Sequence, residues 1–255
     1  MTDPLKLVLY ATQNNGYNII KYLTSRKDAD IKLVIIYPDQ KNFRNTRLIS
    51  LLKKLKLPFK IYRHDLLLFP FIKRINPDII FSVSWRNKIP LYILKCSKMG
   101  GVNLHIGLLP QYSGTFINAW PLINGENEAG STLHWMTDTF DMGNIIHEEK
   151  FPITAWDTGS EVFEKLSKSC VLGFKKAWPF ARNWLKESWK QKGKRKFYSL
   201  IDYKRTNKID LEKNMKVGDF INLLRGKTFK GFKVAYFVDP ITQKKVYVSI
   251  NLTSE

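Results

Sequence analysis

The class of fold is indicated most clearly by residues 79–107, IIFSVSWRNKIPLYILKCSKMGGVNLHIG. The stretch begins with a continuous apolar run, IIFSVSW, which is typical of a strand that is buried on both faces of a sheet. Apolar residues at helical spacing follow over 89–100, and two glycines end that segment. A second apolar run, GGVNLHIG, then begins. This order of strand, helix and strand predicts two parallel strands of one sheet.

The same alternation extends to both sides of this stretch. It predicts an α/β fold with a doubly wound, mostly parallel sheet, followed by a short C-terminal helix and a β-hairpin. The expected strands are residues 6–12, 31–38, 59–64, 79–85, 101–107, 130–137 and 144–153. The expected helices are residues 15–26, 45–57, 69–78, 89–100, 160–187 (bent at Pro179) and 217–226, and the hairpin is 232–252.

The composition limits the class of protein. A chain of 255 residues allows one large domain, or one domain with a small appendage. Its two cysteines, Cys96 and Cys170, are too few for a disulfide framework and favour a reducing compartment. The first residues lack the pattern of a signal peptide, and the longest apolar stretch, 66–72, is too short to span a bilayer. We therefore expect a cytoplasmic protein with no membrane partner.

The charge is strongly positive and unevenly distributed. The formal net charge is +20, yet Lys150 is the only basic residue in the mostly acidic segment 101–160. Basic residues dominate the C-terminal region. A basic field favours anionic partners, namely nucleic acid, phosphorylated metabolites or an anionic membrane surface, although many lysines also simply keep a chain soluble.

Two polar side chains break the apolar pattern at the end of the fifth predicted strand. Asn103 and His105 are two residues apart, so they point to the same side of the strand, at the sheet edge where α/β proteins bind ligands. Asp141 lies in the tight turn FDMG. An amide, an imidazole and a carboxylate suit the transfer of a group between nitrogen atoms, because together they bind an oxyanion and move a proton. The alternatives are an edge-strand pair bonded to backbone and an ordinary turn aspartate.

The histidines do not indicate a metal site. His105, His134 and His147 lack the close spacings that metal ligands usually show. His134 alternates along an apolar strand, which favours a structural role. We therefore predict no metal.

Five ordered motifs resemble a known family. They are NLHIGLLPQYSG (103–114), AWPLINGE (119–126), GSTLHWM (130–136), FDMGNII (140–146) and ITAWDT (153–158). In this order they resemble the catalytic domain of the formyltransferases that use N10-formyltetrahydrofolate, which include the glycinamide ribonucleotide, methionyl-tRNA and sugar N-formyltransferases. The resemblance covers about residues 5–190 and implies a Rossmann-like sheet, in agreement with the alternation of strands and helices.

The resemblance also implies roles for individual residues. Asn103 corresponds to the asparagine that stabilises the oxyanion, His105 to the histidine that assists proton transfer, and Asp141 to the aspartate of the D-x-G turn. The folate donor, N10-formyltetrahydrofolate, would lie against two loops. Their residues are Ser84, Trp85, Arg86, Asn87, Lys88 and Ile89 in the first, and Thr137, Asp138, Thr139 and Phe140 in the second.

Within this family, length and loops favour the sugar N-formyltransferases. The tRNA enzymes carry a further barrel domain, and the glycine-rich phosphate loop of the purine enzyme is not matched by ATQNNG at 11–16. The resemblance therefore implies a nucleotide-linked amino sugar as acceptor, with deoxythymidine diphosphate as the nucleotide, for surface-polysaccharide (O-antigen) synthesis, and no nucleic acid. The candidate acceptor contacts are Gln111, Tyr112, Trp120 and His147, although Trp120 also suits core packing.

Two alternatives to this function remain. The alternatives are a minimal methionyl-tRNA formyltransferase, which the positive charge would suit, and a non-catalytic relative that binds folate or RNA.

We expect a catalytic domain over 1–190, then a basic linker and a helix–hairpin subdomain over 191–255. A lone hairpin is marginally stable, so it must pack on its own subunit or on a second copy. The resemblance favours a homodimer formed through this subdomain.

Overall fold

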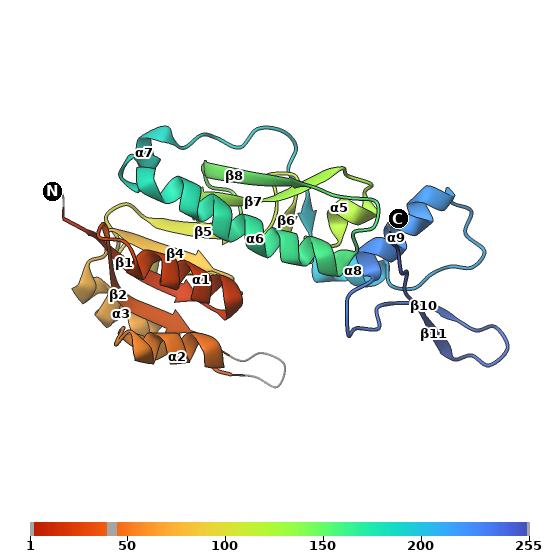
Figure 1. Cartoon of the computed structure of the whole chain (residues 1–255), viewed down its shortest axis with the longest axis horizontal. Coiled ribbons are helices and arrows are strands. Elements are labelled where there is room, and N and C mark those ends of the chain that lie inside the picture. The colour runs from red at the N-terminus through yellow and green to blue at the C-terminus, as the bar shows by residue number, and fades with distance from the viewer. Residues whose placement is uncertain (1–2, 40–44, 254–255) are drawn as a thin grey trace. The chain divides into compact units, whose positions relative to one another are not determined.

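The computed structural model describes residues 3–39 and 45–253, and Figure 1 shows their arrangement along the chain. The strands are β1 (Leu5–Ala11), β2 (Ala29–Ile36), β3 (Phe59–Ile61), β4 (Ile79–Val83), β5 (Gly101–His105), β6 (Ser113–Gly114), β7 (Glu128–Trp135), β8 (Ile145–Pro152), β9 (Phe197–Tyr198), β10 (Ala235–Val238) and β11 (Lys245–Val248). The α-helices are α1 (Gln13–Thr24), α2 (Thr46–Lys54), α3 (Asp65–Ile75), α4 (Leu91–Leu94), α5 (Trp120–Ile123), α6 (Gly159–Ala177), α7 (Trp184–Glu187), α8 (Leu200–Arg205) and α9 (Val217–Lys227), with a 3₁₀-helix, η1, over Trp178–Asn183.

A seven-stranded sheet forms the centre of the fold. Its strand order is β3-β2-β1-β4-β5-β7-β8. The pairs β2–β3, β1–β2, β1–β4 and β4–β5 are parallel, whereas β7 runs antiparallel to β5. The predicted doubly wound, mostly parallel sheet is therefore confirmed, as is the C-terminal helix with its hairpin, β10–β11.

Helices cover the two faces of the parallel strands, and the alternation of side chains sorts the core between them. On one face, Phe81 and Val102 pack with side chains of α1, α2 and α6. On the other face, Tyr10 and Ile80 pack with side chains of α3 and α4. Asn103 and His105 alternate with Val102 and so belong to the second face. The sequence pattern thus places two polar side chains on a face that is mostly apolar.

Several element boundaries differ from the prediction. The helix expected over 69–78 begins at Asp65 instead. The His64 ring accepts a hydrogen bond from the Leu66 N–H (3.2 Å) and so caps the start of the helix. Pro70 lies inside the helix. The helix expected over 160–187 ends at Ala177 and continues as η1 and α7. The proline ring disfavours the α conformation for the residue before it, which explains why the α-helix is interrupted next to Pro179. The segment expected to be a helix over 89–100 forms only the four residues of α4, and β6, α5, β9 and α8 were not predicted.

The chain divides into two compact units. The first comprises Met1–His105, Thr132–His147 and Cys170–Gln191, and the second comprises Ile106–Ser131, Glu148–Ser169 and Lys192–Glu255. The second unit has its own aromatic core, in which Trp120 and Tyr198 stack with ring centroids 4.3 Å apart and Tyr203 contributes a third buried ring. Over residues 3–39 and 45–253, no helix is both long and apolar enough to cross a membrane.

A buried lysine ties α9 to α8 in the second unit. Lys227 is 1% exposed, and its Nζ donates to the Tyr203 carbonyl (2.7 Å) and to Asn207 Oδ1 (2.9 Å) while lying 3.3 Å from the Tyr203 ring centroid. Burial lowers the pKa of Lys227 to about 7. Because an unfolded lysine titrates near pH 10.4, the unfolded state binds more protons between these two values.

We expect this lysine to make the protein more stable at pH 9 than at pH 7. The pKa of Lys227 is lower in the folded state than in the unfolded state. The free energy of unfolding therefore rises by about 2 kcal/mol from pH 7 to pH 9 through Lys227 alone. The measurement is urea unfolding at both pH values. Lys227→Met should lose the rise, whereas Lys216→Met, at an exposed position, should keep it. An equal rise in all three proteins would contradict the assignment.

Candidate active site

Asn103 is held by residues on the two strands beside its own. The sheet register places Ser82 of β4 and His134 of β7 directly opposite Asn103 of β5. Asn103 Oδ1 accepts a hydrogen bond from Ser82 Oγ (2.7 Å), and its Nδ2 donates to His134 Nε2 (3.1 Å). These partners fix the orientation of the amide, because the Ser82 hydroxyl donates to its oxygen while His134 Nε2 accepts from its nitrogen. Within residues 3–39 and 45–253 the second N–H of the Asn103 amide has no partner, so it can bind a developing negative charge.

His134 is the neutral partner in this arrangement. Its Nδ1–H donates to the Trp135 carbonyl (2.8 Å), which leaves Nε2 as the acceptor for Asn103. His134 is almost fully buried, and burial, followed by the nearby His105, lowers its pKa to about 4. The ring therefore stays uncharged at neutral pH. The structural role predicted for His134 thus includes orienting the amide of Asn103.

Asp141 lies between the two imidazoles. Its Oδ1 is 3.6 Å from His105 Nδ1 and 3.7 Å from His134 Nε2. Because His134 Nε2 accepts from Asn103, His105 is the better placed of the two rings to pair with Asp141. His105 and Asp141 are both buried, so water screens the interaction between these two side chains only weakly.

The turn that carries Asp141 needs an unusual backbone. Asp141 has a φ of 57°, in the left-handed region that aspartate tolerates better than most residues. Gly143 follows where a Cβ would lie 1.8 Å from the Trp135 carbonyl oxygen, so only glycine fits. The Gln191 side chain bonds the turn from outside, since its Nε2 donates to the carbonyls of Asp141 (2.8 Å) and Gly143 (2.9 Å). The close contact at Gly143 and the hydrogen bonds from Gln191 thus hold the predicted D-x-G turn, and with it the Asp141 carboxylate, in place.

The three candidate catalytic residues therefore come together in the first unit. Asn103, His105 and Asp141 were predicted from two separate motifs, and the antiparallel pairing of β5 with β7 brings those motifs side by side. Together they place an amide, an imidazole and a carboxylate within one cluster of side chains. Such a set can assist attack of an amine on an acyl carbon.

The two loops predicted to hold the folate donor meet at one point. Lys88 Nζ and Asp138 Oδ1 form an ion pair at 2.6 Å. Ser84 has a φ of 54°, and its carbonyl accepts from Thr12 Oγ1 (2.8 Å). Trp85 stacks on Tyr37 with centroids 4.0 Å apart.

The other residues of these two loops divide into exposed and buried ones. Ile89 is buried in the core that α3 and α4 cover. The exposed ones are Arg86, Asn87, Thr137, Thr139 and Phe140. These loops thus have a backbone that is held by the Thr12 hydrogen bond and the Lys88–Asp138 ion pair, and side chains that are mostly exposed.

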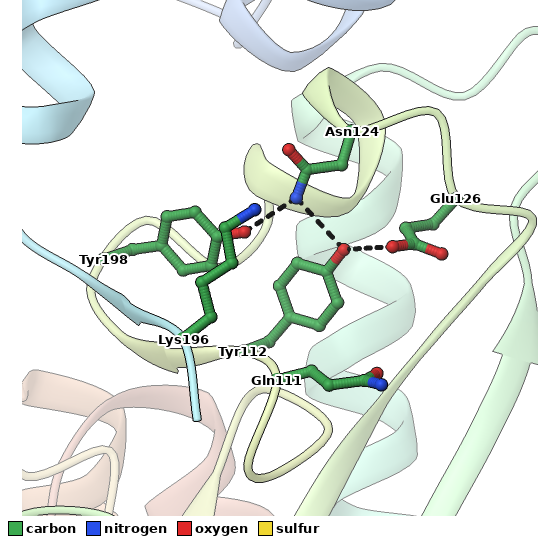
Figure 2. A pocket seen from close by; sticks show the side chains of 6 residues that line it. All are labelled: Gln111, Tyr112, Asn124, Glu126, Lys196 and Tyr198. Atoms are coloured by element: carbon green, nitrogen blue, oxygen red, sulfur yellow. Dashed lines mark hydrogen bonds between the residues drawn. The ribbon is translucent and has the colours of Figure 1, made fainter. Parts of the chain in front are cut away.

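A pocket in the second unit contains two of the predicted acceptor contacts. Figure 2 shows its lining of Gln111, Tyr112, Asn124, Glu126, Lys196 and Tyr198, around a cavity of about 340 Å³. Tyr112 OH donates to Glu126 Oε1 (2.6 Å), and Asn124 Nδ2 donates to the hydroxyls of both Tyr112 (3.2 Å) and Tyr198 (2.7 Å). Of the other two candidates, Trp120 is buried against Tyr198 and His147 is half-buried on β8.

Several residues around these sites were not predicted from the sequence. Ser82, Gln191, Lys196 and Tyr198 carry no local signal, because each reaches its partners through sheet register or through pairing across a long stretch of chain. Within the part of the chain that the structure describes, no group of three or more His, Cys, Asp or Glu side chains could hold a metal ion.

Comparison with known proteins identifies the family of this chain. The model of the formyl transferase family matches residues 7–176, about two thirds of the chain, and that of the N-formyltransferase dimerization C-terminal domain matches residues 202–254. GDP-perosamine N-formyltransferase of Brucella melitensis is 34% identical over 138 residues, which are 54% of this chain and 53% of that protein. The chain thus spans about half the length of this curated relative.

Solved structures share the fold over most of the chain. A 4-N formyltransferase from Francisella tularensis has a TM-score of 0.83 at 24% identity, with all of both chains covered. An N-formyltransferase from Helicobacter canadensis, in complex with folinic acid and dTDP-3-aminofucose, has a TM-score of 0.73 at 23% identity, covering 91% of this chain and 83% of that one. On the family match and the five motifs, the chain belongs to the formyl transferase family.

Proposed function

We propose that this protein transfers a formyl group from N10-formyltetrahydrofolate to the primary amine of a nucleotide-linked amino sugar. The observation that carries the proposal is the Asn103 amide, held by Ser82 and His134 with one N–H left over, next to the His105–Asp141 pair. The similarity to a GDP-perosamine N-formyltransferase and to a structure with folinic acid and dTDP-3-aminofucose supports this donor and this class of acceptor.

The residues suggest a simple sequence of steps. The neutral amine attacks the formyl carbon, a C–N bond forms, and the carbonyl electrons move onto oxygen, where the free N–H of Asn103 stabilises them. His105 accepts the proton that the amine loses, and Asp141 stabilises the resulting imidazolium. When the electrons return from oxygen, the bond to N10 breaks and N10 takes the proton that His105 had accepted, which returns His105 to its neutral form. The products are the formamide and tetrahydrofolate.

The nucleotide and the pathway are finer parts of the proposal. We propose deoxythymidine diphosphate as the nucleotide, which the Helicobacter complex supports, while the Brucella relative makes guanosine diphosphate its main competitor. The net charge of +20 suits either diphosphate. We further propose a role in surface-polysaccharide synthesis, and a cytoplasmic location, which is supported by Cys96 and Cys170 forming no disulfide among the described residues.

The test is a panel of acceptors with a fixed formyl donor. Purified protein would be mixed with N10-formyltetrahydrofolate and, in turn, dTDP-linked and GDP-linked 3-amino and 4-amino deoxysugars, a matched sugar without an amine, and methionyl-tRNA. Tetrahydrofolate release would be followed by absorbance. Turnover with one amino sugar supports the proposal and names the acceptor, whereas turnover with methionyl-tRNA alone would replace it with the tRNA alternative.

We also propose that the chain forms a homodimer through the C-terminal subdomain of residues 191–255, next to a catalytic domain over 1–190. The match to a dimerization domain over 202–254 supports this, as do exposed apolar side chains there, including Val217, Phe232 and Ile241. Sedimentation equilibrium at micromolar concentration should show a dimer that Phe232→Glu weakens. A monomer of the unchanged protein would refute this part of the proposal.

Replacing His134 should slow the proposed reaction without unfolding the protein. His134→Leu leaves the Asn103 amide without its acceptor, so the amide can turn away from the oxyanion. We expect kcat to fall about tenfold to a hundredfold, with KM for the donor changed much less, since loss of one oxyanion donor costs about a hundredfold or more. His134→Gln, which keeps an acceptor, should recover part of the loss. Equal kcat in His134→Leu and the unchanged protein would show that the amide is oriented by Ser82 alone.

A further inference from the structure

The outward side of α3 is apolar, although the inward side of the same helix already supplies core residues. Leu68 and Ile72 are buried beneath it. Leu66, Leu67 and Phe71 point outward and are 63%, 60% and 47% exposed. Their spacing places Leu67 and Phe71 one helical turn apart, with Leu66 beside them, so they form one continuous patch. Together with the exposed Pro70, these three residues make up the α3 face.

Basic side chains surround the α3 face. The Nζ of Lys60, on the edge strand β3, lies 3.8 Å from the ring centroid of Phe71. Arg63, Lys73 and Arg74 are exposed just before the helix and in its last turn. The single acidic residue of segment 45–77 is Asp65, which is buried and accepts hydrogen bonds from the hydroxyls of Tyr62 (3.0 Å) and Tyr10 (3.5 Å). The rim of the patch is therefore positive without a compensating exposed carboxylate in that segment.

We propose that the α3 face docks this protein on an anionic phospholipid surface. A helix that exposes leucine and phenylalanine between lysines and arginines can bury its apolar side chains at the headgroup boundary while the basic side chains meet lipid phosphates. The formal net charge of +20 strengthens the attraction at long range. The proposal departs from the expectation that no membrane is a partner, and it does not depend on which substrate the enzyme uses.

Two other occupants fit the α3 face less well. In a symmetric dimer the same patch meets itself, so Lys60, Lys73 and Arg74 would face their own copies and repel one another. A nucleic acid would pair with the basic rim, but its phosphates and bases gain little from exposed leucines, which cannot stack as aromatic rings do. A partner that is both anionic and apolar just below its surface satisfies both parts of the patch.

The experiment is co-sedimentation of the full chain with lipid vesicles. We expect binding to vesicles of phosphatidylcholine with about one third phosphatidylglycerol, weak binding to pure phosphatidylcholine, and a loss of binding at high salt. Leu67→Glu with Phe71→Glu should weaken binding about tenfold or more, and Lys73→Ser with Arg74→Ser should weaken it at low salt. Formyl transfer in the absence of vesicles should be unchanged in both double variants.

A matched control separates the α3 face from general hydrophobicity. Phe180→Glu with Leu185→Glu removes an equally exposed phenylalanine and leucine from η1 and α7, with the same change of charge. This variant should bind vesicles as the unchanged protein does. The proposal is overturned if the unchanged protein does not bind anionic vesicles or binds neutral ones equally. It is also overturned if the Leu67/Phe71 variant binds normally, or loses only self-association or RNA binding.

Discussion

Replacing His105 by alanine should lower kcat for formyl transfer about a thousandfold, with much smaller changes in KM for donor and acceptor. His105 Nδ1 lies 3.6 Å from Asp141 Oδ1, whereas Nε2 of the other nearby ring, His134, accepts a hydrogen bond from Asn103. Without it, the attacking amine must lose its proton to water, and general base catalysis is worth about a hundredfold to ten-thousandfold. Steady-state kinetics with the acceptor found in the panel would measure the effect.

Asp141→Asn is the companion variant, because it keeps the size of the side chain and removes its charge. It should also slow the reaction strongly. The loss should not add to that of His105→Ala, since we propose that Asp141 acts by stabilising the protonated ring. Fully additive losses, or a His105→Ala enzyme with nearly normal kcat, would mean that the proton leaves by another route.

Replacing Gly143 by alanine should strongly destabilise the first unit, although the change adds only one methyl group. The added Cβ would lie 1.8 Å from the Trp135 carbonyl oxygen and 2.6 Å from its carbon, both backbone atoms that cannot rotate away. Either the turn or the end of β7 must move. We expect a loss of about 3 kcal/mol or more in the free energy of unfolding, measured by urea denaturation.

Gly218→Ala is the matched control for this change. A Cβ at Gly218, in the first turn of α9, meets no atom within 4 Å, and alanine favours helix. It should therefore be neutral or stabilise the protein by up to about 1 kcal/mol. If Gly143→Ala were as stable as Gly218→Ala, the close approach of the turn to Trp135 would not exist in solution.

The periodic parts of the fold were predictable because their signals are local. Alternating strands and helices gave the parallel sheet, and the spacing of Asn103 and His105 placed both side chains on one face. Helix ends were less predictable. The start of α3 depends on the His64 cap, and the end of α6 depends on Pro179, which interrupts a pattern that otherwise continues to Glu187.

The contacts that complete the site were not predictable, because they depend on pairing across the chain. His134 reaches Asn103 only because β7 runs antiparallel to β5 in one particular register, and a shift of one residue would turn it to the other face. Gln191 bonds the Asp141 turn from a segment that is far away in the sequence. Tyr198 joins the pocket in the second unit through the short pairing of β9 with β6.

The most direct test of the proposed activity follows the formyl group itself. N10-formyltetrahydrofolate labelled with ¹³C in the formyl carbon would be incubated with the amino sugar selected by the panel, and the sugar product would be analysed by mass spectrometry and NMR. We predict a labelled formamide on the sugar nitrogen, one per molecule, that is almost absent with His105→Ala. Tetrahydrofolate released without label on the sugar, or equal labelling by His105→Ala, would contradict the account.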